Sequence, residues 1–179
     1  MPDVTTLAVR VATAEDAAQI SHVHRESWRT TYAGILPVEV IAREAGRKTE
    51  LAWRQWLERD EGFCKTFVVE LPGEGIVGFA FCGDAREPIH HLEAEIYALY
   101  VLQSHQRRGV GSALVRECAR HFVRHGLFGF YLWVLKANRA RLFYSALGGE
   151  VVAEASDTLA GHPFAKEAYG WQDLTALVG

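Results

Sequence analysis

The sequence predicts a single α/β (α+β) domain, residues 1–179, with a mixed, mostly antiparallel sheet of six or seven strands flanked by about four helices. Three observations predict this class. β-rich runs separated by turn residues indicate antiparallel hairpins, one of them at residues 66–82 and another near the end of the chain. A buried strand, an amphipathic helix and a second buried strand succeed one another over residues 92–135, which requires a central parallel pair with a right-handed crossover. The composition, 49% hydrophobic and 23% charged, is typical of a soluble globular domain.

The first elements are a strand and two helical stretches. Residues 7–11 alternate in hydrophobicity as a half-buried strand does, and Thr13 with Asp16 has the spacing of a capping box that begins a helix. Residues 28–37 are rich in Thr, Tyr, Gly and Pro, and a loop is expected there before a second helical stretch at 37–59. The residues expected to face inward are Ala17, Ile20, His24 and Ser27 in the first helix and Trp53, Trp56 and Leu57 in the second.

The middle of the chain is expected to form the centre of the sheet. Runs 66–71 and 76–82 flank a Pro-Gly turn and are expected to pair antiparallel. A polar loop is expected at 83–91, and residues 92–102 then form a central strand, because both of its faces are apolar toward the carboxyl end. Strict alternation predicts one face with Glu93, Glu95, Tyr97, Leu99 and Val101, and the other with Leu92, Ala94, Ile96, Ala98 and Tyr100.

The last third continues with alternating helices and strands. An amphipathic helix is expected from Gly109 to about Gly126, with Cys118 in its buried stripe and His121 and His125 on its wet face. A buried strand at 128–135 and a helix at 138–147 follow. The chain is then expected to close the sheet with a hairpin of two strands, 151–155 and 166–171.

A glycine turn connects the central strand to the amphipathic helix and predicts an anion-binding cradle. Unpaired backbone N–H groups and the positive end of a helix dipole meet at such a turn, and glycines let the main chain approach a phosphate closely. The sequence excludes two familiar phosphate motifs. No glycine precedes any of the four lysines, as a Walker motif requires, and Leu114 stands where the dinucleotide fingerprint needs glycine or alanine. The residues of the cradle are Gln106, Arg107, Arg108, Gly109, Val110, Gly111 and Ser112.

Charge and composition exclude several other classes. A net charge of −3 does not indicate binding to nucleic acid. Apolar runs such as 128–135 are far shorter than the ~20 residues of a membrane helix. Cys64, Cys82 and Cys118 are widely spaced, which predicts no zinc or redox pair and favours a reducing cytoplasmic location. We expect no metal site either, because His121 and His125 lack a third ligand.

The central strand, the Gln106-x-x-Gly109-x-Gly111 turn, the crossover helix and the stretch from Asn138 to Gly149 together resemble the GNAT superfamily of N-acetyltransferases. The order of elements along the whole chain is similar as well. The combination is what makes the resemblance specific, since Asn138 is followed by a family-like run of residues: Phe143, Tyr144, Leu147 and Gly148. Two departures stand out: Asn138 and Tyr144 are six residues apart rather than the common seven, and Gln103 replaces a frequent proline.

The resemblance implies that acetyl-CoA is the cosubstrate. It implies hydrogen bonds from the main chain of Leu99, Tyr100 and Val101 to the pantetheine arm, like an added β-strand. It further implies that the N–H groups from Arg107 to Ser112 hold the pyrophosphate and that Asn138 contacts the cofactor. Trp28 and Tyr32 lie in the segment that usually lines the acceptor site in this family, with packing as the alternative role.

Two residues are candidates for the chemistry. An amine attacks a thioester only when neutral, so a base is useful, and Glu95 is the first candidate because histone-type relatives place a catalytic glutamate on this strand. Glu93 is second, and a merely solvated or arginine-paired glutamate is the alternative. Tyr144 matches the family tyrosine near the thioester sulfur, where a phenol can protonate the leaving thiolate; structural packing is its alternative.

The sequence therefore predicts an N-acetyltransferase that acts by direct attack of a primary amine of a small molecule or a peptide, without a metal. We expect acidic residues to attract a cationic acceptor, namely Glu26, Asp84, Glu87 and Glu95. A non-catalytic acyl-CoA-binding regulatory module and a small nucleotide-binding protein are the alternatives. No nucleic-acid or membrane partner is expected, and the family habit with the exposed last strands predicts a homodimer.

Overall fold

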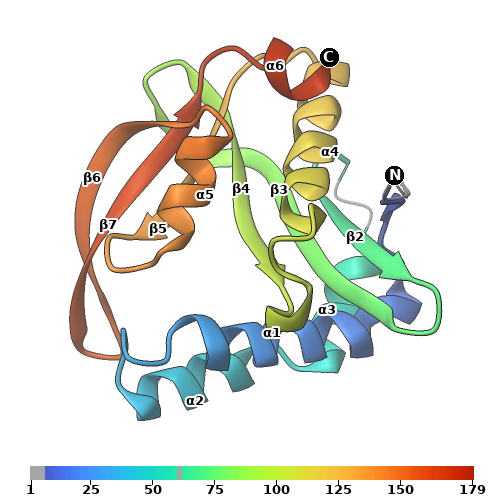
Figure 1. The fold of residues 1–179 in the computed structure, drawn as a ribbon, viewed down its shortest axis with the longest axis vertical. Helices are drawn as coiled ribbons and strands as arrows, with labels where there is room; N and C mark the ends of the chain where they lie inside the picture. The colour runs from blue at the N-terminus through green and yellow to red at the C-terminus, as the bar shows by residue number, and fades with distance from the viewer. Residues whose placement is uncertain (1–6, 60–61) are drawn as a thin grey trace.

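The computed structural model describes residues 7–59 and 62–179. Its centre is one seven-stranded sheet in the order β1-β2-β3-β4-β5-β7-β6, in which β4 and β5 are the parallel pair. This confirms the mixed, mostly antiparallel sheet with a central parallel pair (Figure 1). The strands are β1 (Val9–Val11), β2 (Lys65–Leu71), β3 (Gly75–Ile89), β4 (Leu92–Val101), β5 (Phe130–Leu135), β6 (Glu150–Leu159) and β7 (His162–Trp171).

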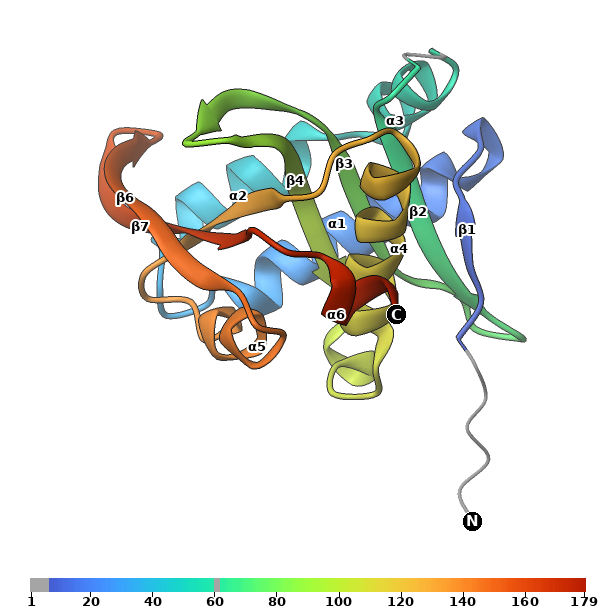
Figure 2. The ribbon, with the colours of Figure 1, turned by 90° about the horizontal axis from the view of Figure 1, so that it is seen from above.

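Helices cover both faces of the sheet. Figure 2 shows α4, α5 and α6 on the near face, with α1, α2 and α3 behind the strands. Two apolar clusters correspond to these layers, one between the sheet and α4 and the other between the sheet, α1 and α3. The α-helices of the described residues are α1 (Ala17–Thr31), α2 (Val38–Arg47), α3 (Glu50–Leu57), α4 (Val110–Arg124), α5 (Ala140–Ala146) and α6 (Thr175–Val178).

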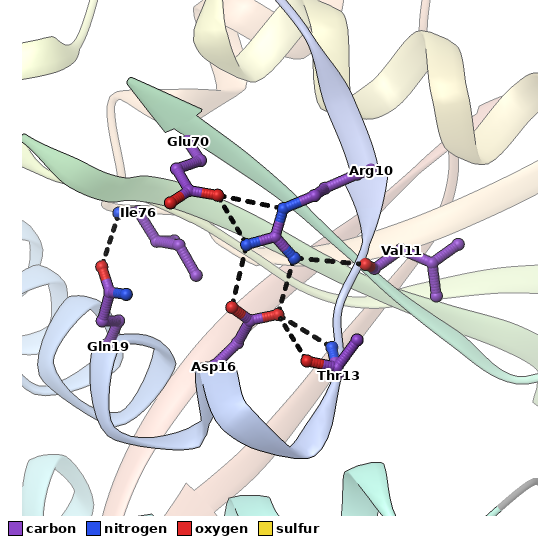
Figure 3. A network of polar contacts seen from close by, with 7 residues as sticks. All are labelled: Arg10, Val11, Thr13, Asp16, Gln19, Glu70 and Ile76. Atoms are coloured by element: carbon purple, nitrogen blue, oxygen red, sulfur yellow. Dashed lines mark hydrogen bonds and ion pairs between the residues drawn. The ribbon is translucent and has the colours of Figure 1, made fainter. Parts of the chain in front are cut away.

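Polar contacts fix the first strand to the first helix, as Figure 3 shows. Arg10 of β1 donates to Asp16 at 2.7 and 2.9 Å and to Glu70 of β2 at 2.7 and 3.0 Å. Asp16 also accepts from the Thr13 backbone N–H at 2.8 Å, so the predicted capping box is confirmed. Gln19 accepts from the Ile76 backbone N–H at 2.8 Å, which connects α1 to the start of β3.

Some predicted boundaries are wrong. The first four residues of the expected loop at 28–37 continue α1, and the expected helix at 37–59 is broken by Lys48 and Thr49 into α2 and α3. Thr49 caps α3, because its hydroxyl accepts from the Ala52 N–H, so a capping residue ended one helix and began another. Residues 83–89, expected as a loop, extend β3, and the last hairpin is longer than predicted.

Candidate active site

The cleft of this protein lies where β4 and β5 separate. The two parallel strands are registered only at Ala94 with Phe130 and Glu95 with Tyr131, although both continue beyond these positions. A cleft of about 1070 Å³ follows, lined by the later residues of both strands, by the turn before α4 and by the start of α5. Main-chain groups on the free side of β4 are thereby available to a ligand, as at a sheet edge.

A bulge at Tyr97 changes which side chains of β4 share a face. Phe81 of β3 is paired with Ala98, and the next residue, Cys82, is paired with Ile96, so Tyr97 is the extra residue. Ile96 therefore packs in the same cluster as Leu99 and Val101, on the α4 side. The expectation that Glu95 shares a face with Leu99 and Val101 is wrong, because one inserted residue reverses the alternation.

The predicted cradle has the geometry of an anion site. Gly109 caps α4 in the left-handed conformation with φ of 84°, and the first backbone bond of the helix runs from the Ala113 N–H to the Gly109 carbonyl at 2.9 Å. The amides of Val110, Gly111 and Ser112 precede this bond, so they have no partner within the helix. They are the donors that a diphosphate needs at a helix N-terminus.

Three further features of the cradle were not visible in the sequence pattern. Arg107 has a φ of 60°, which is rare for a residue with a side chain and typical of functional turns that gather N–H groups. The space beside Gly111 is taken by Phe143 of α5, whose Cζ would lie 3.1 Å from a Cβ at that position. Gln106 also fixes the turn, since its side-chain amide donates to the Val101 carbonyl at 3.2 Å.

Asn138 and Tyr144 lie on the opposite wall of the cleft, at α5. The Asn138 side-chain oxygen accepts from the Ala140 N–H at 2.9 Å in the turn that leads into α5, which leaves its NH₂ group to donate elsewhere. Tyr144 lines the cleft but is only 7% exposed. Burial, with a smaller contribution from nearby Tyr32, raises the pKa of the Tyr144 phenol, so the hydroxyl holds its proton at neutral pH.

Two aromatic residues at the carboxyl end of α1 lie at one side of the cleft. The Tyr32 ring lines the cleft and packs on Trp28 with ring centroids 4.4 Å apart, so Trp28 is behind it rather than in the lining. Tyr100 joins both in one cluster. Burial raises the pKa of Tyr32, with an opposing effect of its hydrogen bond to Tyr100, and burial raises that of Tyr100 well above its usual value.

Glu95 lies outside the lining of the cleft. Its side chain is 1% exposed and accepts from the Arg86 backbone N–H and Nε, both at 3.1 Å, and Arg86 Nη2 completes the ion pair. The Tyr131 hydroxyl is within 3.1 Å of the same carboxylate. This is the arginine-paired arrangement that the sequence left open as the alternative to a base. None of the other expected acidic residues, Glu26, Asp84 and Glu87, belongs to the lining either.

Most of the predicted site residues converge on this one cleft, and Val110, Trp28 and Glu95 do not line it. Val110 is 1% exposed and contributes its backbone only. The sequence reasoning missed Trp133, Leu135 and Arg139, although the parallel partner of β4 had to supply part of the wall. The predicted residues that do line the cleft are Tyr32, Leu99, Tyr100, Val101, Gln106, Arg107, Arg108, Gly109, Gly111, Ser112, Asn138 and Tyr144.

His121 has a structural role in this arrangement. His121, expected on the wet face of α4, is 5% exposed and contacts the Phe63 carbonyl through Nε2 at 2.7 Å. The residue is buried because the segment before β2 covers that side of the helix. Across residues 7–59 and 62–179 no group of three or more His, Cys, Asp or Glu could hold a metal ion. In the same stretches, none of the helices is both long and apolar enough to cross a membrane.

Comparison with known proteins agrees with this fold. The Acetyltransferase (GNAT) family matches residues 20–148, so the chain belongs to this family of N-acetyltransferases. It is 33% identical over 171 residues to the uncharacterized N-acetyltransferase YuaI of Bacillus subtilis, covering 96% of each chain. A spermidine N(1)-acetyltransferase of Thermoplasma acidophilum is 25% identical over 136 residues, which is 74% of this chain and 81% of that protein.

Solved structures show the same fold. The PaiA N-acetyltransferase of Thermoplasma acidophilum in complex with coenzyme A superimposes with a TM-score of 0.71, covering 91% of this chain and 98% of that one at 22% identity. The mixed sheet with one parallel pair is thus the fold of the family. The chain is an acyltransferase by its membership of this family.

Proposed function

We propose that this protein transfers the acetyl group of acetyl-CoA to a primary amine of a small molecule or a peptide by direct attack in a ternary complex. The observation that carries the proposal is the cleft itself, because an anion cradle at α4, a free edge of β4 and a buried phenol at α5 meet in one cavity. A CoA thioester has a diphosphate, an amide-bearing arm and a sulfur in that same order.

The residues of the cleft are suited to the parts of the cofactor. The amides after Gly109 would hold the diphosphate, with Arg107 and Arg108 pairing to its outer oxygens. The main chain of residues 99–101 would bind the pantetheine arm as an added strand, because β5 no longer pairs there. The NH₂ group of Asn138 is free to donate to the same arm, since the Asn138 side-chain oxygen is the group that accepts from the Ala140 N–H.

The chemistry would use Tyr144 as the acid. Attack by the amine places negative charge on the thioester oxygen, for which main-chain N–H groups of the β4 edge are the available donors. Collapse then expels the CoA thiolate, and the Tyr144 hydroxyl, which is protonated at neutral pH, can hydrogen-bond the sulfur and deliver a proton to it while the phenol regains a proton from the attacking nitrogen. For Glu95, its ion pair with Arg86 supports a positioning role at the closed end of the cleft.

Tyr32 is the proposed contact for the acceptor, and Trp28 supports it from behind through their ring contact. The homodimer remains a proposal, supported by β6 at the edge of the sheet, and light scattering would test it. The cytoplasmic location is also a proposal, supported by three cysteines that are free in the structure, Cys64, Cys82 and Cys118.

The test is thiol release from acetyl-CoA with a panel of primary amines, followed by mass spectrometry of the products. The panel includes spermidine, which the name of one relative gives as its acceptor. The enzyme proposal predicts free CoA thiol and an acetylated product with at least one amine. Saturable CoA binding without turnover for any amine would favour the regulatory module, and displacement of CoA by ATP at equal concentration would favour a nucleotide-binding protein.

A further inference from the structure

The charged side chains that line the cleft are all arginines. Arg107 and Arg108 belong to the cradle, and Arg139 precedes α5. The lining, taken over the described residues, has no aspartate, glutamate, histidine or lysine. The acceptor end, defined as the part lined by Tyr32, Tyr100, Leu135 and Tyr144, is therefore surrounded by phenols and aliphatic carbon. It offers no negative charge to a cation.

The ionisable groups behind this lining are neutral, packed against an aromatic ring, or paired with an opposite charge. His24 of α1 touches Tyr100, with ring centroids 5.5 Å apart, and burial lowers its pKa to about 4. Lys166 of β7 lies over Trp133 of β5, 4.8 Å from the ring centroid. Each buried carboxylate of the described chain is paired with an arginine, in the pairs Asp16–Arg10, Glu44–Arg47, Glu95–Arg86 and Glu167–Arg141.

These surroundings discriminate between the two forms of an amine. An ammonium group that leaves water without a counter-charge loses several kcal/mol of hydration, whereas a neutral amine loses much less. The phenols cannot remove the proton, because burial raises the pKa of Tyr32, Tyr100 and Tyr144 and keeps all three protonated at neutral pH. An acceptor that arrives as the free base avoids both difficulties.

We propose that the cleft selects weakly basic primary amines, which enter neutral, such as an α-amino group next to a carbonyl in an amino-acid amide or a peptide. Alkylamines and polyamines are poor acceptors in this proposal. It rests on the proposed function and names the substrate class of the same site. The reaction balances for a neutral amine. The C–N bond forms, the C–S bond breaks, and the proton lost by the nitrogen ends on the CoA sulfur.

The test compares glycinamide, propylamine and spermidine with saturating acetyl-CoA between pH 6 and 9.5. An α-amino group has a pKa of about 8 and an alkylamine about 10.4, so the neutral fraction at pH 7 differs by roughly 100-fold or more. We expect kcat/KM for each acceptor to rise with pH until the pH reaches that acceptor's own pKa, and glycinamide to be faster than the alkylamines at pH 7 by that factor. An ascending limb at one pH for all acceptors, or spermidine equal to glycinamide at pH 7, overturns the proposal.

A matched pair of variants tests the missing counter-charge. Thr31, the half-buried last residue of α1, lines the cleft beside Tyr32 and has no place in the proposed machinery. Thr31→Glu should raise the spermidine-to-glycinamide ratio of kcat/KM at least tenfold, and Thr31→Gln should leave it unchanged. An unchanged ratio in Thr31→Glu contradicts the proposal. Thiol release with none of the amines would instead contradict the proposed function itself.

Discussion

The Tyr131 hydroxyl lies 3.1 Å from a carboxylate oxygen of Glu95, and these two residues are also the last registered pair of β4 with β5. The same hydroxyl is 2.7 Å from the Glu87 carbonyl of β3. With Arg86 on the other side of the carboxylate, one polar group connects three strands where the cleft begins. Glu95, which the sequence suggests as a base, therefore connects β3, β4 and β5 in the structure.

Tyr131→Phe tests this connection, because it removes the hydroxyl that contacts Glu95. Loss of a hydrogen bond to a charged group should lower the free energy of unfolding by about 1.5–3 kcal/mol. Because the strands separate directly beyond this pair, the dissociation constant of CoA should also rise, by about threefold or more, and calorimetric titration measures it. Unchanged CoA affinity in a variant with the expected loss of stability would contradict a positioning role.

Tyr144→Phe tests the proposed role of Tyr144 as the general acid. Removal of the phenol proton should lower kcat about 100-fold, within the range of general acid catalysis, and leave the CoA dissociation constant unchanged. Tyr169→Phe is the matched control, because Tyr169 is equally buried at 7% exposure and packs on Tyr144 with ring centroids 5.9 Å apart, outside the cleft lining. Equal kcat values in the two variants would assign Tyr144 to packing alone.

The sequence predicted the parts of this site that depend on local pattern. The glycine turn, the helix after it and the parallel crossover follow from residue types and periodicity, and the structure confirms each. The bulge at Tyr97 does not, because an inserted residue is visible only in the pairing with β3. The faces of β4, and with them the surroundings of Glu95, were therefore assigned wrongly. The predicted exposure of His121 was wrong for a similar reason, because Phe63, which covers it, is far away in sequence.

Acid should destabilise the fold through His24. Its pKa is lowered from 6.5 to about 4 by burial among aromatic rings, and its Nδ1 has no hydrogen-bond partner. Between pH 6.5 and 4 the unfolded chain binds a proton at this site and the folded chain does not, so stability falls as the pH falls. The total for this group is about 3 kcal/mol.

Denaturant unfolding of wild type and His24→Phe at several pH values between 4.5 and 7.5 measures this contribution. The variant removes the titrating group and keeps an aromatic ring, so its unfolding free energy should decline less steeply with acid than that of the wild type. Parallel pH profiles for the two proteins would show that His24 already takes its proton near pH 6.5 in the folded state.

The cradle glycines can be tested against a glycine elsewhere. Gly109 has a φ of 84°, and a side chain in that region costs about 1–2 kcal/mol, so Gly109→Val should distort the turn and weaken CoA binding at least tenfold. Gly46→Ala in α2 is the control, because its Cβ would meet nothing within 4 Å. It should leave CoA affinity unchanged and raise stability by about 0.5–1 kcal/mol. Equal affinities in both variants would contradict the cradle.

The most direct measurement is a calorimetric titration of the wild-type protein with CoA and, separately, with pantetheine, which keeps the thiol and the arm but lacks the nucleotide and its phosphates. Binding of the diphosphate by the amides after Gly109 predicts a saturable heat with CoA and an affinity for pantetheine at least 100-fold weaker. Equal affinities for the two ligands, or no saturable heat with CoA, would contradict binding of the CoA diphosphate by these amides.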